Sequence, residues 1–196
     1  MRVTNRREFL QTAAVLSAAP LAGRIAAFAA GRESAALEAV VFDTRHAAAR
    51  DFGARAGLLG VPQRSIDGDI TALWQHELRD RWRTAPVSVA GLTERPALFL
   101  LERLAWDHGL RVVFEAEHQP DGRGSAVHRV VRPADPGLAV ELDAAGPRWA
   151  SALASALVAG AVARARDFRP TSSGLVARPG EPLTLSSWII GPRTAA

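Results

Sequence analysis

The sequence contains no cysteine, no lysine and no tyrosine, and each absence excludes a kind of site. Without cysteine there is no disulfide, no thiolate nucleophile, and no iron–sulfur or cysteine-ligated zinc site. Without lysine there is no Schiff-base amine and no lysine for a phosphate-binding loop. The lack of tyrosine removes the phenolic acid or base. Chemistry must therefore come from Asp, Glu, His, Arg, Ser and Thr, and the sequence predicts no cofactor.

The first 30 residues differ in character from the rest. They carry a pair of basic residues followed by two apolar ones: Arg6, Arg7, Phe9 and Leu10. A short run rich in Ala and Leu comes next, and it closes on small residues near Ala29 and Ala30. This order is typical of a secretory signal. The arginine pair with its Phe-Leu sequence resembles the twin-arginine (Tat) export signal over residues 2–30. The resemblance implies passage of a folded protein through the Tat translocase, cleavage near Ala29 or Ala30, and a periplasmic location.

The apolar run and the charge balance limit the partners that we expect. Thr12–Ala22 is about half of the roughly 20 residues needed to span a bilayer, and Pro20 interrupts it, so no stable membrane anchor is predicted. Residues 1–30 hold four of the 24 basic and one of the 20 acidic residues, so removing them lowers the net charge from +4 to +1. A nucleic-acid partner needs a basic surplus or stripe, and none is visible.

Residues 31–196 are long enough for one domain with a core. Compact apolar or alternating runs predict five strands: Leu37–Asp43, a weak edge strand Val61–Ile66, Pro86–Leu92, Leu110–Glu117 and Leu183–Ile190. The turn over 119–125 predicts a hairpin that pairs Leu110–Glu117 with Ala126–Arg132. Helical spacing predicts helices over His46–Leu59, Ile70–Arg83, Glu94–His108 and Trp149–Arg166, with linkers over 133–137 and 170–182.

Three strand–helix units followed by a hairpin, a helix and a last strand indicate an α/β layered domain. Helical crossovers join the first three strands, so these are expected to be mostly parallel within a mostly parallel central sheet.

Polar residues follow the carboxyl ends of the first three strands, where open α/β sheets bind ligands. They are Asp43, Thr44, Arg45, His46, Gly68, Asp69, Gly91 and Thr93. Each group leads into a helix N-terminus, which favours anions. We therefore expect a rim site for a small anionic ligand, with Asp43, His46 and Asp69 as candidate catalytic residues. The alternative is that Thr44, Asp69 and Thr93 only cap helices.

Other motifs are incomplete. The string VVFDTR resembles the first motif of aspartyl-phosphate phosphatases, but Arg45 stands where the second Asp is required and no lysine exists, so the resemblance fails. Gly53, Gly57 and Gly60 lack dinucleotide-binding spacing.

Metal and nucleophile motifs are equally incomplete. Glu115, Glu117, His118 and His128 form the best metal candidate, yet strand alternation separates the first two side chains from His118. They are read as an exposed hairpin face, so no metal site is predicted. No serine lies in a nucleophile elbow.

These observations favour an exported, non-catalytic protein: either a ligand-binding domain or an accessory subunit, such as one of a redox complex, that is carried with a larger exported partner. The alternative is a small periplasmic hydrolase or isomerase that acts on an anionic molecule at the rim. The sequence alone leans toward the non-catalytic function and leaves the enzyme open.

Overall fold

The computed structural model describes residues 37–121, 123–132, 136–160 and 183–192. The predicted export signal over residues 1–30 lies outside these ranges. So do the predicted loop over 170–182 and residues 161–166 of the helix predicted over 149–166. The described part of that helix ends at Val158, earlier than predicted. None of the helices within the described ranges is long and apolar enough to cross a membrane.

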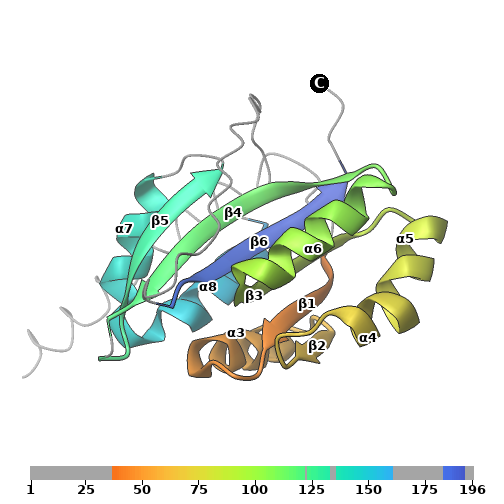
Figure 1. Ribbon diagram of the computed structural model, residues 1–196. Coiled ribbons are helices and arrows are strands. Elements are labelled where there is room, and N and C mark those ends of the chain that lie inside the picture. The colour runs from red at the N-terminus through yellow and green to blue at the C-terminus, as the bar shows by residue number, and fades with distance from the viewer. Residues whose placement is uncertain (1–36, 122, 133–135, 161–182, 193–196) are drawn as a thin grey trace, which may run out of the picture.

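A six-stranded sheet forms the centre of the described chain, in the order β2-β1-β3-β6-β4-β5 (Figure 1). Its strands are β1 Leu37–Asp43, β2 Gln63–Ile66, β3 Ser88–Glu94, β4 Leu110–Pro120, β5 Ala126–Arg132 and β6 Leu185–Pro192. β1 is parallel to both β2 and β3, as the helical crossovers predict. The other three pairings, β3–β6, β6–β4 and β4–β5, are antiparallel.

The layered α/β class is therefore confirmed, but the sheet is mixed rather than mostly parallel. The reason is the place of β6. The last strand inserts between β3 and β4 and runs antiparallel to both of them. The apolar pattern of a strand indicates that it is buried but not which strands it pairs with, so the insertion of β6 between β3 and β4 was not predicted.

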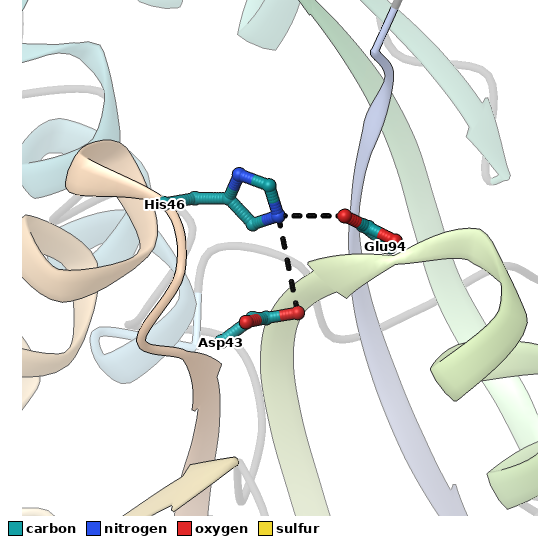
Figure 2. Close-up of side chains that lie close together, drawn as sticks. All are labelled: Asp43, His46 and Glu94. Carbon is teal, nitrogen blue, oxygen red and sulfur yellow. Dashed lines mark hydrogen bonds and ion pairs between the residues drawn. The ribbon is translucent and has the colours of Figure 1, made fainter. Parts of the chain in front are cut away.

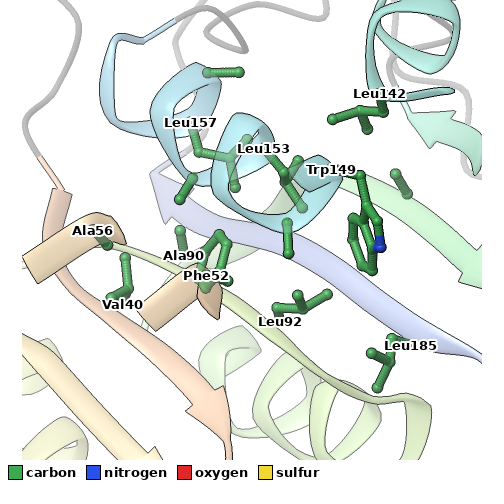
Figure 3. Close-up of a cluster of buried hydrophobic side chains, with 14 of the residues drawn as sticks. Val40, Phe52, Ala56, Ala90, Leu92, Leu142, Trp149, Leu153, Leu157 and Leu185 are labelled. Atoms are coloured by element: carbon green, nitrogen blue, oxygen red, sulfur yellow. The ribbon is translucent and has the colours of Figure 1, made fainter. Parts of the chain in front are cut away.

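Helices cover both faces of the sheet. Their bounds are α3 Ala47–Leu58, α4 Thr71–Leu73, η1 Trp74–Leu78, α5 Arg79–Thr84, α6 Arg95–Trp106, α7 Pro136–Ala145, η2 Gly146–Arg148 and α8 Trp149–Val158. α3, α7 and α8 share one core with the sheet, around Phe52, Trp149 and Leu153 (Figure 3). α4, η1, α5 and α6 share the core on the opposite face. Successive β1 residues show the alternation: Val40 belongs to the first core and Val41 to the second.

Two helical expectations need correction. The helix predicted over Ile70–Arg83 is three consecutive pieces, of which η1 is a π-helix. α7 begins at Pro136, inside the segment predicted as a linker over 133–137. Its residues are apolar nearly all round, so they show little helical periodicity.

Candidate functional site

The carboxyl ends of β1 and β3 lie side by side because the two strands are parallel neighbours. β1 ends at Asp43, whose side chain is fully buried. β3 ends at Glu94, two residues beyond the predicted end of this strand. His46 follows β1 as the N-cap residue of α3, with an extended backbone. Two strand ends and a helix start thus meet at one point of the rim (Figure 2).

Three potential ligand atoms converge at this point, and we call Asp43, His46 and Glu94 the rim cluster. His46 Nε2 lies 2.8 Å from Glu94 Oε1 and 3.9 Å from Asp43 Oδ2. All three donor atoms lie within 4.8 Å of one another. The side chains of His46 and Glu94 are 14% and 26% exposed, so the cluster is open to solvent from one side.

Arg45 holds Asp43 in place. Its Nε donates to Asp43 Oδ1 at 2.9 Å and its Nη2 to Oδ2 at 2.6 Å, while Nη2 also lies 3.1 Å from Glu94 Oε1. Burial acts to raise the pKa of Asp43, but the hydrogen bonds from Arg45 outweigh it and hold that pKa below its ordinary value. The same hydrogen bonds, together with the nearby carboxylate charges, raise the pKa of Arg45. Asp43 is therefore a fixed anion at neutral pH.

Gly68 makes room for this guanidinium. It has a φ of +98°, and a Cβ placed there would lie 2.5 Å from Arg45 Cζ. The turn between Asp67 and Asp69 consequently packs against the rim cluster through Arg45.

The structure brings only some of the predicted rim residues together. Asp43, Arg45, His46 and Gly68 meet as described. Asp69 is exposed, and its Oδ1 accepts hydrogen bonds from the backbone N and Oγ1 of Thr71, the first residue of α4. The N-cap position of α4 is Ile70, so Asp69 lies one residue before the cap position predicted for it. Thr44 does not cap α3. Its Oγ1 donates to the Ile66 carbonyl at 2.9 Å, and α3 has no side-chain cap.

Gly91 and Thr93 serve the packing of Trp188 instead of the rim. Thr93 is fully buried; it accepts a hydrogen bond from Trp188 Nε1 at 3.1 Å and does not cap α6. A Cβ at Gly91 would collide with the Trp188 ring. The predicted cap at Thr93 is wrong because β3 continues through this residue to Glu94.

Sequence reasoning missed Glu94, the third member of the rim cluster. It was assigned to the first turn of the following helix, where an acidic residue is common. The available signal was its position directly after a buried strand that runs parallel to β1.

The alternative metal candidate lies elsewhere and is not an exposed hairpin face. His118 and His128 are buried, with their Nδ1 atoms 2.8 Å apart, and His118 Nε2 lies 2.7 Å from Ser187 Oγ. Glu115 is buried as well, where it pairs with Arg95 and Arg132. Strand alternation places Glu117 on the same face of the sheet as Glu115 and opposite His118.

Beside the rim, an open groove of about 710 Å³ runs between β2 and the helix that begins at Thr71. It contains Thr44 and Asp69 of the predicted site, together with Asp67. The turn 67–69 therefore separates this groove from the rim cluster.

Comparison of the chain with protein-family models, with curated proteins and with solved structures finds no match.

Proposed function

We propose that this protein is an exported, non-catalytic binding protein that holds a divalent metal ion at the rim cluster. The observation that carries the proposal is the convergence of two carboxylate oxygens and one imidazole nitrogen within 4.8 Å. The periplasmic location and the role as an accessory subunit are proposals that rest on the N-terminal sequence.

The charge of the site favours a cation over the anion expected from the sequence. Two carboxylates face one guanidinium, so the site carries one net negative charge when the imidazole of His46 is neutral. Arg45 is the basic group of the predicted anion site, but it is already bound by Asp43 and Glu94. An anionic ligand would have to compete with both carboxylates for it.

The donor set suits Zn²⁺ or Mn²⁺. Zinc binds imidazole nitrogen and carboxylate oxygen at about 2.0–2.2 Å in a tetrahedral arrangement, which places ligand atoms roughly 3.4 Å apart. His46 and Glu94 would therefore separate slightly from 2.8 Å, and His46 and Asp43 would approach each other from 3.9 Å. The ion would replace the proton that His46 and Glu94 share in their hydrogen bond. Three protein ligands leave a coordination position for water or for a group of a partner. Arg45 would not bind the ion itself but would fix the orientation of the Asp43 carboxylate through its hydrogen bonds.

Metal titration tests the proposal. We expect chelator-treated protein to bind ZnCl₂ or MnCl₂ at one site per chain in isothermal titration calorimetry. His46→Ala and Glu94→Gln should each weaken binding by about tenfold or more, by analogy with the loss of supporting groups around known sites. His76→Ala is the matched control, because His76 is an exposed histidine outside the cluster. No binding up to millimolar metal, or equal binding by the His46 variant, would contradict the proposal.

The second candidate is the enzyme alternative, and the hydrogen bond between His46 and Glu94 favours it. A carboxylate that orients an imidazole is the arrangement of a general base. Against catalysis, the described contacts of the His46 imidazole are with carboxylates and include no hydroxyl nucleophile. A turnover that His46→Ala abolishes without loss of folding would favour the enzyme.

A further inference from the structure

We propose that β2 and the helix facing it form a docking groove for an extended, basic segment of a partner protein, which adds to the sheet as a strand beside β2. The groove is the open space of about 710 Å³ described above. All four β2 residues line one wall of it, and Leu73, His76 and Glu77 line the other.

The backbone of β2 offers hydrogen-bonding groups toward its open edge. Val40 N donates to the Pro62 carbonyl at 2.9 Å, and Thr44 N donates to the Ile66 carbonyl at 2.8 Å. Because strand backbones alternate, even-numbered residues of this segment face β1 with their peptide groups. The N–H and C=O groups of Gln63 and Ser65 therefore point away from β1.

This edge has no strand against it in the part of the chain that the structure describes, where β1 is the one strand paired with β2. The side chains of Gln63 and Ser65 are also exposed. Such an edge is the template that β-strand addition uses, with main-chain hydrogen bonds for affinity and side-chain contacts for specificity.

The charge of the groove selects a basic occupant. Three acidic residues line it, Asp67, Asp69 and Glu77, against one arginine, Arg64, which is paired with Glu77. Asp67 and Asp69 are exposed and supply the surplus negative charge. An extended segment with arginine or lysine at alternate positions would place its cations on one face, toward these carboxylates.

The groove and the rim cluster are linked through the turn 67–69. Gly68 contacts the guanidinium of Arg45, while the residues on either side of it line the groove. A docked segment would consequently lie next to the turn that packs against Arg45. The docking proposal depends on the β2 edge and on the acidic residues of the groove, and on no member of the rim cluster, so it stands or falls independently of metal binding.

A synthetic peptide provides the test. The probe is a fluorescein-labelled peptide of seven residues that alternates arginine and valine, and the measurement is fluorescence anisotropy with the purified protein. In a strand, alternate residues direct their N–H groups to opposite edges. N-methylation of one alternate set should therefore reduce affinity by at least tenfold, whereas methylation of the other set should leave it within about threefold.

Two further comparisons complete the experiment. The double variant Asp67→Asn/Asp69→Asn should weaken binding by at least fivefold, and Asp51→Asn/Asp107→Asn, which changes two exposed acids outside the groove, should not. Ser65→Pro should abolish binding by removing an outward N–H. Absence of binding, equal loss on methylating either set, or no effect of the groove variant would each overturn the proposal.

Discussion

His46 Nε2 lies 2.8 Å from Glu94 Oε1, although 48 positions separate these residues in the chain. Their contact exists only because β1 and β3 pair in parallel, so that the short segment between β1 and α3 faces the end of β3. The rim cluster thus forms only in the folded sheet. Substitution of the residues that hold its members in place, Arg45 and Gly68, should therefore lower both metal affinity and the free energy of unfolding.

Arg45→Ala should destabilise the protein by about 1–3 kcal/mol, because it leaves the buried Asp43 carboxylate without its main hydrogen-bond donor. Arg45→Lys should recover only part of the loss, since an ammonium cannot donate through two nitrogens to both oxygens. Urea unfolding measures both variants. Arg83→Ala serves as control: Arg83 and its partner Asp80 are both exposed, so its loss should change the free energy of unfolding by less than about 1 kcal/mol. Equal effects of Arg45→Ala and the control would contradict the prediction.

Gly68→Ala and Gly60→Ala form a matched pair. Both glycines have positive φ, +98° and +85°, so either substitution should cost about 1–2 kcal/mol in backbone strain. At Gly60 nothing lies within 4 Å of the added Cβ, whereas at Gly68 it would meet Arg45. Only Gly68→Ala should therefore also weaken metal binding, by displacing the guanidinium that orients Asp43. Thermal unfolding of both variants measures the cost of backbone strain, and metal titration measures the effect of displacing the Arg45 guanidinium. Equal metal affinities of the two variants would contradict the prediction, because they would show that the site tolerates a shift of Arg45.

The sequence predicts the elements of this fold better than their arrangement. Leu37–Asp43 is predicted with its observed bounds, because a buried apolar run ending in Asp is a local signal. The hairpin of β4 and β5 follows from its turn residues. The insertion of β6 depends on long-range packing that no short pattern contains.

In the rim cluster, too, the residues close together in the sequence were predicted and the one brought in by strand pairing was not. Asp43, Arg45 and His46 are adjacent in the chain and were identified together. Glu94 joins them only through the pairing of β3 with β1, and it was missed. His118 and His128 alternate with charged residues like an exposed hairpin, yet α7 and α8 cover them, and α7 was not predicted.

Stability should fall as the pH drops below neutrality, because His118 and His128 are buried in their neutral forms. Burial, and to a lesser extent the neighbouring His128, lowers the pKa of His118 from 6.5 to about 3; burial also lowers the pKa of His128. Between these values the unfolded chain binds more protons than the folded one, so protons favour unfolding. The loss should begin near pH 6.5 and continue toward pH 3.

Urea unfolding at pH 7, 5.5 and 4.5 measures this dependence. His118→Gln should flatten it, even though the variant is less stable at pH 7 because Ser187 and His128 lose a partner. Asp43 has a lowered pKa, so its protonation also lowers the free energy of unfolding as the pH falls. This effect occurs only near and below its ordinary pKa of 3.8, so Asp43 does not contribute at pH 7 or 5.5. A free energy of unfolding that is constant from pH 7 to 4.5 would contradict the prediction.

Metal should stabilise the protein by mass action if the rim cluster binds it as proposed. A ligand that binds only the folded state adds about 2.7 kcal/mol at a free concentration of 100 times its Kd. ZnCl₂ or MnCl₂ should therefore raise the midpoint of thermal unfolding, and a chelator should reverse the shift. Glu94→Gln, which weakens binding by about tenfold or more, should reduce this stabilisation to about 1.4 kcal/mol or less at the same metal concentration. Its midpoint without metal should be similar, because Glu94 is partly exposed and its amide can still accept from His46. His76→Ala should respond like the original protein. A shift that is undiminished in Glu94→Gln would assign the stabilisation to a different site, since Glu94 supplies one of the three converging ligands of the cluster.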